Sequence, residues 1–353
     1  MNRFALIIGL ENYAEKIPAV RFAENDASKF EECLIALGYD TRDVTCLASS
    51  QATKTKMESE LRRLASLAQG DDEILFFFAG HGVSISGSNY ITCHDTIKTD
   101  LVNSCISLKW ILDLFKTSKS KRIIVFLDSC HSGFEIDASM RGVIDTLNET
   151  ELEQFFAEAE YQVGFASCRT DQFSYSSPNL RHGIWTHHVL LALRGEASAA
   201  VEKNKYITSA SLQNYLADQV PKTLRIENPN PVVQTPRCFG SFSQEFAVFN
   251  VEAIIAQRNA ERKARLLGVK QIDMLGTKGG SIRELSGFRK GHFVPDKVDG
   301  RTESFVDDIA SQDASEEATE IYEKIKSNFN YKRKEIQLEI NGASAEIATK
   351  DFD

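Results

Sequence analysis

The chain has 353 residues, of which 42% are hydrophobic and 26% are charged, and its formal net charge is -9. These values are typical of a soluble globular protein, with room for one large or two smaller domains. The negative charge argues against nonspecific binding to nucleic acid or to an anionic membrane. No stretch approaches the roughly 18 apolar residues of a membrane span. The first residues lack a signal-peptide pattern, so we expect a cytoplasmic protein.

The first 250 residues predict strands and helices in alternation. In chain order these are a strand at 4–9, a helix near 25–37, a strand at 44–47, a helix at 53–69, a strand at 73–79, a helix at 107–116, a strand at 122–128, a strand at 162–167 and a helix at 183–194. Such alternation predicts an α/β fold with a mostly parallel central sheet and helices on both faces.

The last hundred residues have a different pattern, which begins after the proline-rich stretch 228–236 and a strand predicted at 246–249. A charged amphipathic helix is predicted at 251–267 and another helix at 315–328. Residues 334–347 alternate around Asn341-Gly342, which predicts a β-hairpin. We therefore expect one domain over 1–250 and a smaller α+β region over 251–353. The sequence leaves the role of that region open between regulation and docking.

The seven cysteines form no CxxC pair and are odd in number. This argues against both a zinc ribbon and a disulfide framework. Most are simply interpreted as reduced, buried, small hydrophobic residues, namely Cys33, Cys46, Cys93, Cys105 and Cys238.

Two short polar motifs follow two of the apolar strands. Ala79-Gly80-His81-Gly82 follows the run 74–78, and Asp128-Ser129-Cys130 follows the run 123–127. In open α/β sheets, sites are built at the carboxyl ends of the strands. A His at one strand end and a Cys at another, close in space but distant in sequence, is the layout of a cysteine protease.

These motifs resemble those of the caspase–metacaspase group of cysteine peptidases (clan CD, peptidase C14), in particular its bacterial members. The resemblance covers roughly residues 1–250. Four further segments contribute to it: Phe4–Gly9 with Tyr13, Ala23–Ala27 with Asn25-Asp26, Ala166–Cys168 followed by Asp171-Gln172, and His182–Thr186. The resemblance implies a caspase-like αβα sandwich and an active endopeptidase.

The resemblance also implies the catalytic roles. Cys130 is the expected nucleophile and His81 the general base and acid. The amides of Gly82 and Cys130 are the expected oxyanion hole. This chemistry requires no cofactor. Many metacaspases need calcium, but Asp95 and Asp100 form no recognisable site, so calcium dependence stays open and no metal site is predicted.

Specificity is expected to depend on the residue two before the nucleophile, which is Asp128. In the family, aspartate there accompanies cleavage after Arg or Lys, and glutamine accompanies cleavage after Asp. Family likeness places Asp26 in the same S1 pocket, and two carboxylates complement a guanidinium. We expect cleavage after Arg, then Lys. The alternatives are a helix N-terminal role for Asp26 and a structural hydrogen bond for Asp128.

Other residues are weaker candidates. Asp171 and Gln172 are candidates for a substrate loop, although the family places its aspartate two residues before the glutamine. Trp185 is a candidate for a subsite wall, with core packing as the alternative. Arg141-Gly142 lies between two predicted strands, where caspases carry a processed linker, and is a hypothetical autoprocessing site. The alternative is a solvated loop charge.

Relatives act as effectors of cell death or, in bacteria, of antiviral defence, so the resemblance implies a protein substrate activated by one cut. A sensor or activator protein that binds the C-terminal region is a further expectation, whereas no nucleic-acid partner is expected. Two alternatives stay open: a catalytically silent caspase-fold scaffold, and a caspase-like protease with acidic P1 specificity.

Overall fold

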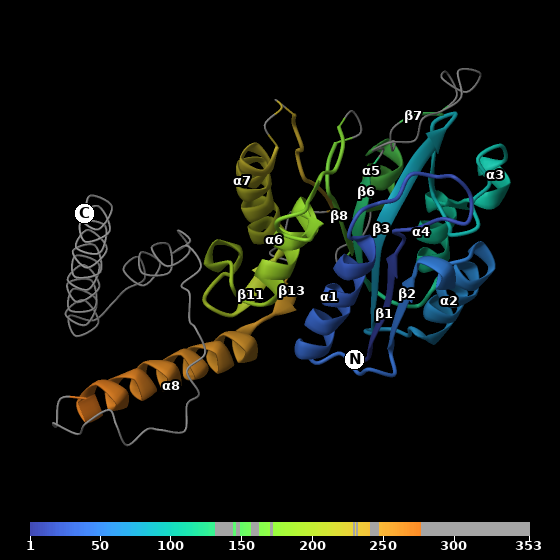
Figure 1. Cartoon of the computed structure of the whole chain (residues 1–353). Coiled ribbons are helices and arrows are strands. Elements are labelled where there is room, and N and C mark those ends of the chain that lie inside the picture. Colours follow the sequence, from blue (N-terminus) through green and yellow to red (C-terminus); the bar gives the residue numbers. More distant parts are fainter. Residues whose placement is uncertain are drawn as a thin grey trace, which may run out of the picture. The chain divides into compact units, whose positions relative to one another are not determined.

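Six strands in the order β12-β8-β6-β3-β1-β2 form the main path of the central sheet, which has nine strands in the described part of the chain (Figure 1). This computed structural model describes residues 1–130, 144–145, 149–156, 162–169, 172–228, 230, 232–240 and 247–276. The strands are β1 (Arg3–Gly9), β2 (Val44–Ala48), β3 (Glu73–Ile85), β6 (Arg122–Cys130), β8 (Gln162–Ala166) and β12 (Arg237–Gly240). Only β12 pairs antiparallel with its neighbour in this order. The predicted, mostly parallel sheet is confirmed.

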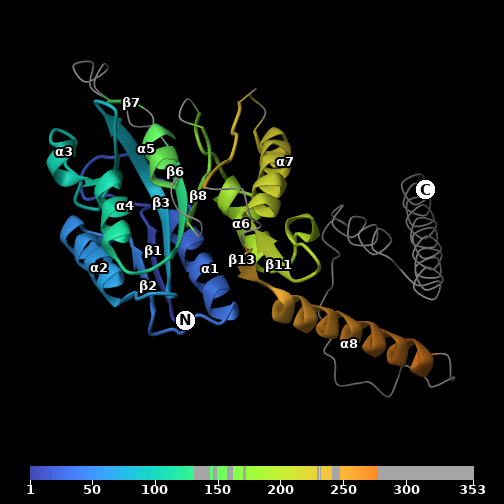
Figure 2. The same cartoon turned by 180° about the vertical axis from the view of Figure 1, so that it is seen from behind.

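Helices cover both faces of this sheet (Figures 1 and 2). The residues that pack together show α1 (Ala23–Ala36), α6 (Ile184–Leu193) and α7 (Ser209–Glu227) on one face. The other face carries α2 (Lys54–Leu67), α4 (Leu108–Thr117) and α5 (Glu149–Phe156). The caspase-like sandwich expected from the sequence is therefore present.

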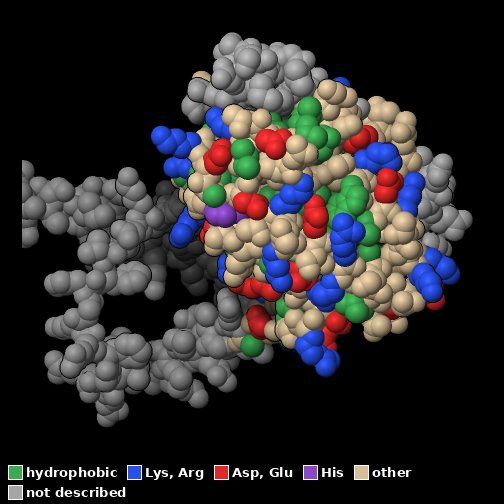
Figure 3. Space-filling view, turned by 90° about the vertical axis from the view of Figure 1, so that its right-hand side faces the viewer, with side chains coloured by type: hydrophobic (Ala, Val, Ile, Leu, Met, Phe, Trp, Pro, Cys, Tyr) green, Lys and Arg blue, Asp and Glu red, His purple; other side chains and the backbone are tan. Residues whose placement is uncertain are grey.

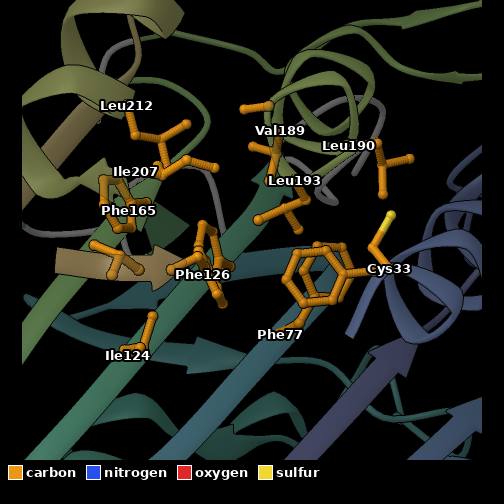
Figure 4. Close-up of a cluster of buried hydrophobic side chains, with 14 of the residues drawn as sticks. Cys33, Phe77, Ile124, Phe126, Phe165, Val189, Leu190, Leu193, Ile207 and Leu212 are labelled. Atoms are coloured by element: carbon orange, nitrogen blue, oxygen red, sulfur yellow. The ribbon is translucent and has the colours of Figure 1, made fainter. Parts of the chain in front are cut away.

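The central strands supply both cores because successive side chains point to opposite faces. Phe77, Phe126 and Phe165 pack towards α1 and α6 (Figure 4). Phe76 and Val125 pack towards α2 and α4. Strands buried on both faces need apolar residues at nearly every position, which explains the continuous apolar runs in β3 and β6.

Strand β3 is longer than predicted, because it continues through His81 to Ile85. Its extension pairs antiparallel with β4 (Ser88–Ile91) and β7 (Ile144–Asp145), and β4 pairs with β5 (Ile106–Ser107). Val83 and Ile85 pack beside the short helix α3 (Leu101–Ser104) in a separate buried cluster. This extra burial explains why the chain stays extended where the sequence predicts a loop.

The segment after α6 also differs from the prediction. It contains helix α7, which is not among the elements predicted from the sequence and which has Pro221 in its interior. Proline normally interrupts a helix, so the pattern is weak there. The strand predicted at 246–249 is β13 (Ala247–Asn250), which pairs with β11 (Tyr206–Thr208) in a separate sheet. The smaller elements are η1 (Ser49–Gln51), η2 (Ser198–Ala200), β9 (Ser176–Ser177) and β10 (His182–Gly183).

Helix α8 (Glu252–Gly276) extends beyond the predicted end at residue 267. Near its start, Arg258 donates a hydrogen bond to the Gly195 carbonyl. The chain divides into two units, Met1–Met274 and Leu275–Asp353, and the predicted helix at 315–328 and hairpin at 334–347 lie outside the described residues. Within the described part of the chain, each helix is too short or too polar to cross a membrane.

Cys33, Cys93 and Cys105 are buried with free thiols, whereas Cys46 and Cys238 are half-buried and also free. Burial raises the pKa of the Cys46 thiol to about 12.

On the face shown in Figure 3, acidic and basic side chains are intermingled.

Candidate active site

The two residues of the predicted catalytic dyad lie opposite each other in the central sheet. His81 of β3 is paired in register with Cys130, the last residue of β6. Neighbouring strands are about 4.8 Å apart, so the two backbones are adjacent. The structure thus brings together the His and Cys motifs that are distant in sequence.

His81 is fully buried and held by several contacts. Its Nε2 donates to the Pro18 carbonyl at 2.8 Å. Since a carbonyl only accepts, Nε2 carries the hydrogen, and in the neutral imidazole Nδ1 is then the basic nitrogen. The Tyr13 ring stacks on the imidazole, with centroids 5.4 Å apart. These contacts fix the tautomer and the orientation that a general base needs.

The backbone at His81 is also held in place. Its amide donates to the Tyr13 hydroxyl at 3.1 Å. Its carbonyl accepts from the Thr92 hydroxyl at 2.9 Å and the Thr92 amide at 3.1 Å. Gly82 follows in the same strand and is paired with Ile91 of β4. The two residues expected to form the oxyanion hole, Gly82 and Cys130, therefore lie on neighbouring strands.

A cavity of about 360 Å³ lies at the carboxyl ends of these strands. The residues around it come from the loop before α1, from α1, β3, β6, the segment 174–176 and β10: Ala19, Val20, Arg21, Ala23, Asp26, Ala79, Asp128, Ser174, Tyr175, Ser176 and Gly183. Asp26 and Asp128 are both buried, whereas Arg21 is exposed. The two residues predicted for the S1 pocket thus line one cavity.

Asp128 ends the apolar run of β6 and turns its carboxylate to hydroxyl donors. Oδ1 accepts from the Ser174 hydroxyl at 2.7 Å, and Oδ2 accepts from the Thr186 hydroxyl at 2.5 Å. Burial raises the pKa of Asp128, and hydrogen bonds from Thr186 and Ser174 oppose that rise. Asp128 therefore has the structural hydrogen bonds of the alternative interpretation and also lines the cavity.

Asp26 lies in the first turn of α1, but its hydrogen bonds go to β10. Oδ1 is 2.5 Å from His182 Nδ1, and Oδ2 accepts from the Gly183 amide at 2.9 Å. Burial raises the pKa of Asp26 well above its ordinary value, and the nearby Asp128 raises it further. Burial also lowers the pKa of His182, to about 4.

Gly183 lies beside the carboxylates of both Asp26 and Asp128. A Cβ atom at this position would lie 2.7 Å from Asp128 Oδ2 and 3.1 Å from Asp26 Oδ2. Both distances are shorter than ordinary contacts, so a side chain here would displace the carboxylates. The absence of a side chain lets both acids reach the same part of the cavity.

The other candidates are placed differently. Trp185 is fully buried and packs against Phe126, with ring centroids 6.1 Å apart, so the structure places it in the core. Gln172 accepts from the Thr235 amide at 2.7 Å and is not among the residues that line the cavity. Asp171 and Arg141 lie outside the described residues.

Several supporting residues are absent from the sequence-based site. The Pro18 carbonyl is a backbone acceptor, which a side-chain pattern does not reveal. Ser174 and Thr186 reach Asp128 from distant parts of the chain. His182, Gly183 and Thr186 belong to the segment 182–186 that contributes to the family resemblance, but their contacts with Asp26 and Asp128 depend on the fold.

Among the described residues, no three His, Cys, Asp or Glu side chains are grouped so that they could hold a metal ion. Asp95 accepts from the Lys54 amide at 2.7 Å, and Asp100 accepts from the Asn103 side chain at 2.8 Å.

Known proteins and one family model are similar to this chain. Metacaspase-8 of Arabidopsis thaliana is 28% identical over 144 residues, which is 38% of this chain and 38% of that relative. The match thus spans less than two thirds of the relative. A crystal structure of protein GSU0716 from Geobacter sulfurreducens has 17% identity and a TM-score of 0.47, over 68% of this chain and 94% of that chain. The caspase-domain model of peptidase C14 matches residues 2–234. The chain therefore belongs to the peptidase C14 family and carries its caspase domain.

Proposed function

We propose that this protein is a cysteine endopeptidase that cleaves protein substrates after a basic P1 residue, Arg first and Lys second. The observation that carries the proposal is the pair of buried carboxylates, Asp26 and Asp128, in one cavity. The cavity lies at the strand ends where His81 is paired with Cys130.

In this proposal the dyad catalyses acyl transfer. His81 Nδ1 takes the proton of the Cys130 thiol, and the thiolate attacks the scissile carbonyl carbon. The amides of Gly82 and Cys130 stabilise the resulting oxyanion, each by roughly 3 kcal/mol in the transition state. The imidazolium then protonates the leaving amine, and water hydrolyses the thioester to release the acid and the thiol.

The cavity accounts for the proposed order of P1 residues. A guanidinium presents a planar fork of donors that can engage both carboxylates, whereas an ammonium is a compact point charge. Arg is therefore favoured over Lys. An acidic P1 residue would meet two buried like charges, which disfavours it strongly.

The proposed physiological role is that of a regulated effector, in cell death or bacterial defence, that acts on a protein by a single cut. Its regulators would be the region 251–353, as a docking site for a sensor or activator protein, and autoprocessing at Arg141-Gly142. We place this activity in the cytoplasm, with no cofactor needed for the chemistry.

The test is a panel of fluorogenic peptides that differ only in P1 (Arg, Lys or Asp), assayed with and without calcium. We expect cleavage after Arg and Lys, abolished in Cys130→Ala and weakened in Asp128→Ala. Cleavage only after Asp would overturn the pocket assignment. Equal turnover by wild type and Cys130→Ala would overturn the dyad. Silence under every condition would support the scaffold alternative.

A further inference from the structure

Gln234 is a fully buried polar side chain close to the cavity, but it does not line it. It lies in the segment 232–236 that leads into β12, between the exposed Val233 and the half-buried Thr235. A buried amide must satisfy its hydrogen bonds within the protein, so its partners indicate its role.

The partners of Gln234 fix the orientation of its amide. Oε1 accepts from the Tyr175 amide at 3.1 Å. Nε2 donates to the Ser167 carbonyl at 3.1 Å and to the Ser174 hydroxyl at 3.0 Å. Only one orientation of the amide fits, because a backbone N–H only donates and a carbonyl only accepts.

The Gln234 side-chain amide begins a chain of hydrogen bonds that runs through the Ser174 hydroxyl to Asp128 in the cavity. A serine hydroxyl has one proton, and Ser174 uses it to donate to Asp128 Oδ1 at 2.7 Å. Ser174 therefore accepts from Gln234 and donates to the carboxylate, and such chains strengthen each member. Through Tyr175 the same amide holds a second cavity residue.

We propose that Gln234 is a positioning residue for the basic P1 pocket. It orients the Ser174 hydroxyl towards Asp128 and anchors the cavity wall at Ser174 and Tyr175, so that affinity for a basic P1 side chain depends on its amide. This inference rests on the proposed function. The hydrogen bonds described for Gln234 go to Ser167, Ser174 and Tyr175 and not to His81, so its effect is expected in substrate binding and not in the chemical step.

The experiment compares Gln234→Glu with the matched control Gln213→Glu. Glutamate keeps the shape of Gln234 but replaces its donor nitrogen with an acceptor, so Ser174 would turn its proton away from Asp128. Gln213 also donates from Nε2, to the Pro236 carbonyl at 2.9 Å in the same segment, but Pro236 does not line the cavity, whereas Ser174 and Tyr175 do. The readouts are KM and kcat on Arg and Lys peptides, with thermal melting to follow folding.

We expect Gln234→Glu to raise KM for Arg peptides by about tenfold or more, as for loss of one hydrogen bond to a charged group. The value of kcat should stay within about twofold, because none of the hydrogen bonds described for Gln234 goes to His81. Gln213→Glu should leave both constants unchanged. Equal effects of the two variants, or a loss confined to kcat, would overturn the proposal.

Ser174→Ala keeps the inference testable if Gln234→Glu does not fold. It removes only a hydroxyl and should produce the same rise in KM. In the double variant the two effects should not add, because Gln234 acts through Ser174. An unchanged KM in Ser174→Ala, or full additivity, would contradict the inference. A wild-type enzyme that cleaves no basic substrate would instead contradict the proposed function itself.

Discussion

Asp26 and Asp128 reach the same point beside Gly183, one from helix α1 and the other from the end of β6. Two ionised carboxylates that are buried so close together repel each other and lose their hydration, so their charged forms are unfavourable unless a cation binds between them. Accordingly, burial and the charge of Asp128 raise the pKa of Asp26. This cost is a reason to expect function, because residues that destabilise the fold in this way tend to serve a site.

The first prediction concerns stability. Asn in place of Asp26 can still accept from the Gly183 amide and can donate to a neutral His182, while the buried charge is lost. Because the folded-state pKa of Asp26 is raised, its stabilising contribution exists at low pH and is lost as the pH rises. We expect Asp26→Asn to raise the Tm by about 2–4 °C near neutral pH, equivalent to roughly 1 kcal/mol.

In the same variant, cleavage after Arg should fall by about 100-fold, the usual cost of removing one partner of a buried charged contact. The gain in Tm should shrink at acidic pH, where the wild-type carboxyl is already protonated. Calorimetry at several pH values tests this. A Tm below that of wild type at neutral pH would show that Asp26 stabilises the fold.

A second prediction concerns Gly183. A methyl group there would lie 2.7 Å from Asp128 Oδ2, so the carboxylates must move apart. We expect Gly183→Ala to raise KM for Arg peptides by roughly 10-fold to 100-fold, with a smaller change in kcat. Gly70→Ala is the control, because a methyl group at Gly70 would meet nothing within 4 Å. The left-handed backbone of Gly70 (φ +51) disfavours a side chain, whereas Gly183 has an ordinary φ of -57. That control should lose only stability.

A third prediction concerns pH. Burial raises the pKa of both Asp26 and Asp128. As the pH falls, both carboxylates are therefore protonated, and the pocket loses its negative charge, at a higher pH than ordinary carboxyl groups would be. Affinity for Arg should therefore be present at higher pH and be lost as the pH falls. KM measured between about pH 5 and pH 8 should rise on acidification. In Asp128→Asn, this rise should move to lower pH, because Asp26 loses its charged neighbour.

The main framework of the fold could be predicted from the sequence because burial on both faces leaves a strong pattern. The apolar runs of β1, β3 and β6 and the helical spacing of α2 identify the alternating elements. Elements held together by distant contacts escaped prediction. Strand β3 passes through His81 because it pairs with β4, and helix α7 tolerates Pro221.

The arrangement of the candidate site was predictable to a similar extent. His81, Cys130, Asp26 and Asp128 stand in recognisable motifs. The fold pairs His81 with Cys130 on neighbouring strands and places Asp26 and Asp128 around one cavity. Their supporting contacts are not local. The donors to Asp128 come from residues 174 and 186, so no spacing in the sequence reveals them.

A fourth prediction separates the two interpretations of Trp185. Its side chain is fully buried among core residues, so Trp185→Ala should lower the free energy of unfolding by about 3–5 kcal/mol. The Trp185→Ala molecules that remain folded should have the same KM for Arg peptides as the wild type. A change in substrate preference at constant stability would instead identify Trp185 as a subsite wall.

A fifth prediction concerns autoprocessing. If the Arg141-Gly142 bond is cut by the proposed specificity, purified wild type should yield two fragments, whereas Arg141→Gln and Cys130→Ala should stay intact. Gel electrophoresis and N-terminal sequencing detect the cut. A fully active chain that remains uncleaved would remove this mechanism.

The most direct test of the account is covalent labelling of the nucleophile by a peptide chloromethylketone, followed by intact mass and peptide mapping. With arginine at P1, we predict one label per chain, located on Cys130, and labelling that slows by about 100-fold in Asp128→Asn. With aspartate at P1, wild type should not react. Faster labelling by the aspartyl reagent, or a label on another cysteine, would contradict the central claim.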